Sequence, residues 1–218
     1  MMDDGEKMRI RYDEGCLAAH ALNVVGDRWA LLVVRELMFA AKRFQVIRSG
    51  LPGISAGVLT QRLTQLETAG VARHDPNTGA YQLTESGRDL LPVLQAIGRW
   101  GAKHPGHDPR RFISPTALMV SMTAMVDQAA AQGRHITAGF RSHHEGFVMR
   151  LTGDGAARVE ATQEIEADFV LEGDGNNLAA AVYGPTPLKD LATAGTITLT
   201  GHVAAAQRFV KLFSLRKD

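Results

Sequence analysis

The sequence predicts an α+β protein of two domains, one made of short helices and one in which helices cover a mostly antiparallel sheet. The 218 residues are 45% hydrophobic and 22% charged, which is typical of a globular chain. A turn-forming cluster, HPGHDP at residues 104–109, separates short helical patterns from a region where helices alternate with strand-like segments. We therefore predict domains at 1–104 and 112–218, joined by a linker at 105–111.

Composition excludes several classes of protein. No apolar run approaches the roughly 18–20 residues that span a bilayer, and the N-terminal segment has no apolar signal region, so we expect a cytoplasmic protein without a membrane partner. The single cysteine, Cys16, rules out an intramolecular disulfide and a zinc-cysteine cluster. Residues 26–104 carry ten Lys or Arg and six Asp or Glu, a net charge of +4 that is compatible with nucleic acid.

The first domain begins with helical patterns. Apolar residues recur at helical spacing over residues 16–25 and 29–38, which predicts two helices with Asp27 as the N-cap of the second. A further turn of helix is predicted at 43–47. The segment LPGIS at 51–55 then predicts a turn that ends in an N-cap serine.

The helix after this turn is predicted at residues 56–69, with Gly70 at its C′ position. At about 100° per residue, three leucines form a core stripe. The opposite face is polar and uncharged, and it either reads DNA or is an ordinary solvent or partner surface, because glutamine can pair with adenine and threonine can meet a thymine methyl. The core stripe is Leu59, Leu63 and Leu66, and the opposite face is Gly57, Thr60, Gln61, Thr64 and Thr68.

Strand-like segments at 71–75 and 80–83 flank the turn PNTG, which predicts a β-hairpin. Helix-turn-helix plus hairpin is the order of a winged helix. Thr84 then caps a helix predicted to run to about Lys103, in which Pro92 either introduces a kink or marks a restart in the first turn.

Taken in order, these segments resemble the HxlR-type winged-helix transcriptional regulators over roughly residues 9–104. The resemblance implies a bacterial DNA-binding homodimer with helix 56–69 in the major groove and the first and last helices at the dimer interface. The wing departs from the family in being short, with Arg73 and His74 as its basic residues. The motifs are Cys16, GDRW at 26–29, RF at 43–44, LPGIS at 51–55, LTQRL at 59–63, LETAG at 66–70 and YQLTESG at 81–87.

The resemblance and the uncharged face together predict a DNA interface, in which basic residues and backbone N–H groups contact phosphates and uncharged side chains face the bases. The predicted phosphate contacts are Lys42, Arg43, Arg62 and the backbone near Ser55. The predicted base-facing residues are Thr60, Gln61 and Thr64, and Asn77 in the wing turn is a further predicted DNA-binding residue.

A homodimer interface is predicted on the first and last helices of this domain, although the apolar face of the last helix could instead pack on its own domain. Some relatives sense oxidants through a cysteine at the position of Cys16, which leaves a redox sensor as an alternative to a small residue buried between subunits. The predicted interface residues are Cys16, Leu17, Leu90, Leu94, Ile97 and Trp100.

In the second domain, Ser114-Pro115 predicts the start of a helix over 116–131 that Gly133 ends. Alternating apolar residues predict an antiparallel hairpin of strands 135–141 and 146–152. The remaining predicted strands are 158–162, 168–172 and 196–200, and the remaining predicted helices are 177–183, 188–194 and 202–215.

The acidic-glycine turn in ADFVLEGD at 167–174, with GTITLTGH at 195–202, resembles sterol-carrier-protein-like domains over about residues 112–215. This resemblance implies an apolar ligand between helices and sheet, although a methionine stripe is also what an ordinary core contains. The predicted ligand-binding residues are Leu118, Met119, Met122, Met125, Phe140, Phe147, Met149, Phe169 and Leu171.

Motifs for catalysis are missing from the sequence: there is no Walker A loop, GxGxxG, HExxH or GxSxG. The segment His143-His144-Glu145 is interpreted as a solvated turn, so we expect neither a metal nor a cofactor. The sequence therefore predicts a non-enzymatic, homodimeric regulator of double-stranded DNA that responds to an apolar ligand. The alternatives are a lipid-like ligand carrier that uses the winged helix only to dimerise, and a regulator that senses redox through Cys16.

Overall fold

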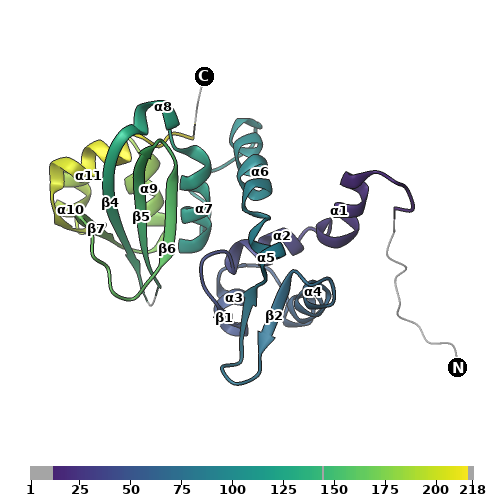
Figure 1. The fold of residues 1–218 in the computed structure, drawn as a ribbon. Helices are drawn as coiled ribbons and strands as arrows, with labels where there is room; N and C mark the ends of the chain where they lie inside the picture. Colours follow the sequence, from purple (N-terminus) through teal and green to yellow (C-terminus); the bar gives the residue numbers. More distant parts are fainter. Residues whose placement is uncertain (1–11, 144, 216–218) are drawn as a thin grey trace, which may run out of the picture.

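The computed structural model describes residues 12–143 and 145–215. Its two halves lie side by side, with helix α6 of the N-terminal half packed against helix α7 of the C-terminal half (Figure 1). The helices are α1 (Leu17–Val25), α2 (Ala30–Glu36), α3 (Phe44–Ser49), α4 (Ala56–Thr68), α5 (Glu85–Arg88), α6 (Leu91–Lys103), α7 (Pro115–Met125), α8 (Gln128–Ala131), α9 (Gly175–Tyr183), α10 (Leu188–Thr193) and α11 (Val203–Val210). The strands are β1 (Lys42–Arg43), β2 (Ala72–Asp75), β3 (Ala80–Leu83), β4 (Gln132–Ser142), β5 (Glu145–Asp154), β6 (Ala157–Ala161), β7 (Phe169–Glu172) and β8 (Thr198–Gly201).

The N-terminal half contains the predicted helix-turn-helix, α3 and α4, followed by the predicted hairpin of β2 and β3. The three leucines of the α4 stripe are almost fully buried, as expected from their spacing. The structure adds the short strand β1, which pairs antiparallel with β3 through Lys42 and Tyr81. A two-residue strand carries too little periodicity to be recognised in a sequence.

The helix predicted from Thr84 to Lys103 is two helices, because the chain breaks between Arg88 and Leu91 and restarts as α6. Pro92 stands in the first turn of α6, where its missing N–H has no helical partner to lose. Of the two alternatives for Pro92, the structure therefore shows the restart.

The C-terminal sheet has the strand order β6-β5-β4-β7-β8. The expectation of a mostly antiparallel sheet is corrected to a mixed one, because the central pair of β4 and β7 is parallel. The chain leaves β6 at one edge, passes through residues 162–168, and enters β7 on the far side of β4. Alternation predicts which residues share a face, but it does not identify a strand's neighbour across such a connection.

Helix α7 ends at Met125, six residues before the predicted end at residue 131. Val126 is extended and forms a bridge with Phe213, and the Asp127 N–H donates to the Leu212 carbonyl at 2.7 Å. Gly133, the predicted helix terminator, lies within β4 with φ +73°. Pairing with a segment about 85 residues away therefore ends the helix, and local sequence does not encode that contact.

The two halves are joined by packing as well as by the chain. Val120 of α7 belongs to the core cluster of the N-terminal half, and Phe39 packs against both cores. The Phe39 and Phe147 rings meet edge to face with 6.4 Å between their centroids. These contacts give the two halves a shared apolar interface.

Among the described residues, no single helix is long and apolar enough to cross a membrane. Within that part of the chain, one pair of consecutive helices, α1 and α2, reaches that length and composition together, and the two helices are bent by 71° relative to each other.

Candidate functional site

Helix α4 presents an exposed, uncharged surface, which we call the recognition face: Gly57, Thr60, Gln61, Thr64 and Thr68. The helix begins where the Ser55 hydroxyl oxygen accepts from the Val58 N–H at 3.3 Å. The one acidic residue of α4, Glu67, is turned toward the wing, where its carboxylate accepts from the His74 N–H at 2.9 Å. The recognition face therefore carries no carboxylate that would repel phosphate.

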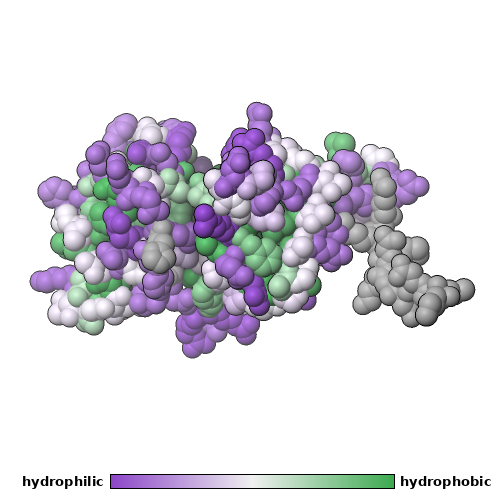
Figure 2. All heavy atoms as spheres, turned by 90° about the horizontal axis from the view of Figure 1, so that it is seen from below, coloured by the Kyte–Doolittle hydropathy of each residue, from purple (hydrophilic) through white to green (hydrophobic). Residues whose placement is uncertain are grey.

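In Figure 2, much of the surface of the N-terminal half beside α1 is pale, and Figure 1 places α4 in that position. Pale colour corresponds to residues of intermediate hydropathy such as threonine and glycine. Threonine and glutamine side chains can contact the edges of bases in the major groove.

Strand β2 of the wing contacts α4, and Arg43 lies on β1, at the opposite edge of the three-stranded sheet. The Arg43 guanidinium is exposed, and its Nε donates to the Thr78 carbonyl at 3.1 Å. The wing turn is closed by Asp75, which accepts from the Asn77 N–H and the Thr78 hydroxyl, each at 2.9 Å. These hydrogen bonds, the one from Asn77 first, lower the pKa of the Asp75 carboxyl. The side chain of Asn77 is exposed at the tip.

Arg62 lies in a different environment from the one the sequence suggested. Its side chain is turned inward, with the residue 9% exposed, and its Nε forms an ion pair with Asp27 at 3.1 Å. Its guanidinium also donates to the side chains of Gln61 and Gln65. This placement argues against the expected phosphate contact, because Arg62 connects α4 to the residues before α2.

Lys42 is also buried, with 5% of the residue exposed. Its Nζ lies 2.5 Å from Glu145, 2.8 Å from the Thr116 hydroxyl and 3.4 Å from Glu36. These partners come from both halves, so the expected phosphate contact of Lys42 is corrected to an interdomain ion pair. A single sequence gives no signal that distinguishes such a lysine from a surface lysine.

Glu36 is the centre of this buried group and was missed in the sequence. Its carboxylate is fully buried and accepts from Arg35 at 2.8 Å and from the Ser114 hydroxyl at 2.6 Å. A carboxylate inside the apolar segment ALLVVRELMF was the available signal, because a buried acid needs partners. We call this group the junction cluster: Arg35, Glu36, Lys42, Ser114, Thr116 and Glu145.

The residues predicted for the dimer interface divide into two groups. Leu17 is 87% exposed and Trp100 67% exposed, and Cys16 and Ile97 are also exposed. Leu94 is buried within its own half and Leu90 is partly buried, which matches the alternative that this side of the last helix packs on its own domain. The exposed apolar surface of α1 and α6 is Leu17, Leu22, Val93, Ile97 and Trp100.

The structure brings the nine predicted ligand-binding residues together, but mostly in a packed core. Eight of them belong to the apolar cluster between the C-terminal sheet and its helices: Leu118, Met119, Met122, Phe140, Phe147, Met149, Phe169 and Leu171. The ninth, Met125, lines a cavity between the two halves. Met119 and Met122 thus fill a core, as the alternative interpretation had it, whereas Met125 does not belong to that cluster.

The cavity at Met125, which we call the interdomain cavity, has a volume of about 570 Å³. Its walls come from α2, α6 and the turn between α3 and α4 on one side, and on the other from α7 and from residues 104–114 between α6 and α7, which we call the connecting segment. A second hollow of about 830 Å³ shares Phe112 and Ser121 with it. There the Tyr183 hydroxyl lies 2.9 Å from the Ser121 hydroxyl, and burial raises the pKa of Tyr183.

Within residues 12–143 and 145–215, no three His, Cys, Asp or Glu side chains are placed to hold a metal ion. His143 is exposed with φ +49°, and Glu145 pairs with Lys42. His144, the middle residue of the predicted solvated turn, lies outside the described residues, as do the predicted domain ends at 1–11 and 216–218.

Comparison with known proteins identifies similarity in the N-terminal half. The model of the HxlR-like helix-turn-helix family matches residues 24–109. The uncharacterized HTH-type transcriptional regulator YvaP of Bacillus subtilis is 36% identical over 88 residues, which are 38% of this chain and 82% of YvaP. A second such regulator, sll1512 of Synechocystis sp., is 37% identical over 92 residues, 40% of this chain and 68% of its own length.

Among solved structures, the quinone-bound YodB from B. subtilis is 32% identical, with a TM-score of 0.37. The match covers 40% of this chain and 97% of YodB. The family model ends at residue 109, before α7 begins.

Proposed function

This chain belongs to the HxlR-like helix-turn-helix family of transcriptional regulators, and on that premise we propose that it binds DNA as a homodimer through α4 and responds to a small apolar effector. Its relatives are named transcriptional regulators, which supports a regulator rather than an enzyme. They do not favour the alternative of a ligand carrier. A DNA-binding regulator would act in the cytoplasm.

The observation that carries the DNA-binding proposal is the exposed, uncharged recognition face on a helix that follows a tight turn. Gln61 and the threonines face the bases in this proposal, and Arg43, Asn77 and the N-terminus of α4 contact the backbone. Lys42 and Arg62 are left out of this set, because both are buried in ion pairs within the protein.

The homodimer proposal is supported by the exposed apolar residues of α1 and α6. Leu17 on α1 and Trp100 on α6 are large apolar side chains that a single chain leaves exposed, and contact with a second copy would bury them. A twofold dimer would place two copies of α4 about 34 Å apart, as successive major grooves require. Cys16, which is exposed beside Leu17, is assigned to this interface.

The effector proposal concerns the C-terminal half, whose sequence resembles sterol-carrier-like domains. We keep the proposed division into domains at 1–104 and 112–218. Its contacts with the N-terminal half supply a route by which a ligand could alter the placement of α4. An effector of this kind must bind the two states of the regulator with different affinity. Operator affinity that is independent of any ligand would contradict this part of the proposal.

The test is DNA binding by the full chain, measured by fluorescence anisotropy on its own promoter region and on random DNA. We expect affinity to fall steeply between about 50 and 200 mM salt, because phosphate contacts release counterions. Gln61→Ala should reduce discrimination between the two DNAs by about 1–3 kcal/mol, and Arg43→Ala should weaken both.

The control is Gln132→Ala, which changes an exposed glutamine of β4 in the other half. Absence of DNA binding at low salt would overturn the proposed function. Equal losses on promoter and random DNA for Gln61→Ala would overturn the assignment of Gln61 to base reading.

A further inference from the structure

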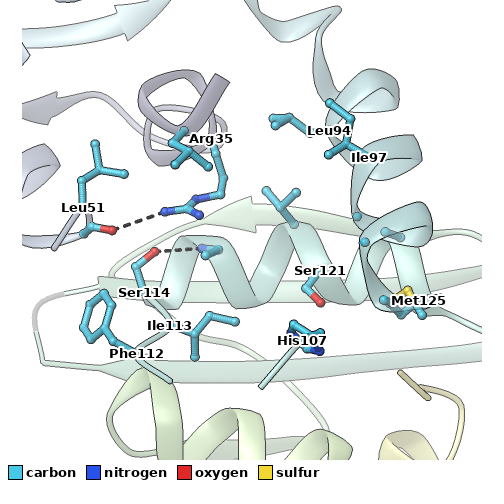
Figure 3. Close-up of a pocket in the computed structure, with 18 of the residues that line it drawn as sticks. Arg35, Leu51, Leu94, Ile97, His107, Phe112, Ile113, Ser114, Ser121 and Met125 are labelled. Atoms are coloured by element: carbon cyan, nitrogen blue, oxygen red, sulfur yellow. Dashed lines mark hydrogen bonds between the residues drawn. The ribbon is translucent and has the colours of Figure 1, made fainter. Parts of the chain in front are cut away.

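The interdomain cavity lies against the helix-turn-helix. Figure 3 shows Arg35 and Leu51 on one side of it, Leu94 and Ile97 of α6 on another, and Phe112 and Ile113 of the connecting segment opposite Arg35. Helix α7 and its N-cap, Ser114, form a further wall, which includes Ser121 and Met125. The volume of the cavity, about 570 Å³, lies within the range of small-molecule sites, about 300–1,000 Å³.

The chemistry of the walls is selective. Most lining side chains are apolar, among them Trp29, Leu32 and Val120, and none of the lining residues that the structure describes is a carboxylate. Arg35 supplies a positively charged side chain that is 21% exposed, and its Nε and Nη2 donate to the carboxylate of Glu36, which does not line the cavity, at 3.1 and 2.8 Å. An arginine at the edge of an apolar pocket favours a ligand with one anionic oxygen group, which would compete with Glu36 for the guanidinium.

We propose that the interdomain cavity is the effector site and that it takes an apolar carboxylate, with the carboxylate on Arg35 and the hydrocarbon part against α6 and α7. This inference deepens the proposed function and rests on it for the effect on DNA. It moves the ligand site from the core of the C-terminal half to the boundary between the halves.

The contacts of Arg35 provide a way in which ligand binding in the cavity would affect the position of α4. Arg35 Nη2 donates to the Gly50 carbonyl at 3.3 Å, and Gly50 is the first residue of the turn between α3 and α4 (Figure 3). The same nitrogen donates to Glu36 at 2.8 Å. A carboxylate that competes for this guanidinium changes the support of the turn that sets the direction of α4.

The second link runs through the C-terminal half. Ser114 lines the cavity and donates to Glu36, while Lys42 joins Glu36 to Glu145 and Thr116. Lys42 immediately precedes Arg43 and α3. A ligand that binds Arg35 would therefore alter contacts that hold both the turn before α4 and the residues before α3.

The test uses octanoate and 1-octanol, which share a chain length and differ in charge, with binding to the full chain measured by calorimetry. We expect octanoate to bind more tightly than 1-octanol. Gly101→Leu should weaken binding of both at least tenfold, because Gly101 lines the cavity and a Cβ there meets open space. Gly98→Leu is a second filling variant, since its Cβ would meet only Ala124, at 3.9 Å.

The matched control is Ala204→Leu, which adds an exposed leucine to α11 and should leave both affinities unchanged. Arg35→Gln should lower octanoate affinity about tenfold, to the level of 1-octanol, and Arg35→Lys, which keeps the charge but not the planar donor geometry, should restore only part of the loss. Circular dichroism establishes that each variant is folded. Unchanged octanoate affinity in both filling variants would overturn the site, and equal affinity for octanoate and 1-octanol would overturn the pairing with Arg35.

The coupling is measured separately, as promoter affinity with and without saturating octanoate. We expect a change of at least threefold in the parent chain and none in Arg35→Gln. Unchanged promoter affinity in the octanoate-bound parent chain would overturn the coupling. Octanoate binding without DNA binding would contradict the proposed function alone, whereas DNA binding without octanoate binding would contradict this inference alone.

Discussion

At the residue scale, Glu36 has the most demanding environment, because a fully buried carboxylate is stable only when positive charges and donors surround it. We expect Glu36→Gln to destabilise the protein by about 3 kcal/mol or more, since it leaves Arg35 and Lys42 without their shared anion. Urea denaturation measures this change. The control is Glu160→Gln, which breaks the exposed pair with Arg150 and should change stability by less than about 1 kcal/mol. Similar losses in the two variants would contradict the role of Glu36.

Gly50 is required by the same cluster. A Cβ at this position would overlap the Glu36 carboxylate, which Arg35, Lys42 and Ser114 hold in place. We expect Gly50→Ala to destabilise by about 1–3 kcal/mol through overpacking. Gly57→Ala is the comparison, because its Cβ meets open space within α4 and should stabilise by about 0.5–1 kcal/mol. Thermal denaturation distinguishes a loss of stability from a gain. Stabilisation by both substitutions would show that the junction cluster rearranges around a Cβ at position 50 without loss of stability.

At the element scale, two serine N-caps that look equivalent in the sequence have different surroundings. Ser55 accepts from the Val58 N–H, and Ser114 accepts from the Ala117 N–H at 3.0 Å. Ser114 is also buried and donates to Glu36.

We expect Ser55→Ala to destabilise by about 1 kcal/mol, the usual value for a lost N-cap. Ser114→Ala should destabilise by about 2–4 kcal/mol, because it removes a cap and a donor to a buried charge. Urea denaturation of both variants under the same conditions is the measurement. Equal losses would mean that the hydrogen bond to Glu36 adds nothing to stability.

At the scale of the whole molecule, the exposed apolar surface of α1 and α6 predicts self-association. We expect Ile97→Asp to shift the protein toward monomer, because a charge within an apolar interface is strongly unfavourable. Analytical ultracentrifugation over a concentration series measures the shift. Val203→Asp is the matched control, since Val203 is a similarly exposed apolar residue on α11, 44% against 48%. An unchanged association state in Ile97→Asp would contradict the predicted interface.

The sequence by itself determined the elements that depend on local chemistry. The core stripe of α4, its N-cap at Ser55, the wing turn at 76–79 and the α+β class follow from spacing, capping and turn residues, and the HxlR-like family follows from motifs in order. The exposed uncharged face of α4 was also predictable, because the residues opposite a buried stripe lie in solvent.

Only the tertiary structure decided the features that depend on partners distant in the chain. It buried Lys42 and Arg62 in ion pairs, made β4 and β7 parallel, and ended α7 by pairing Val126 with Phe213. It also placed a cavity between the halves and filled the methionine core. The physical reason is that helix spacing and capping act over a few residues, whereas burial of a charge and strand partnership are set by whatever the rest of the fold brings beside them.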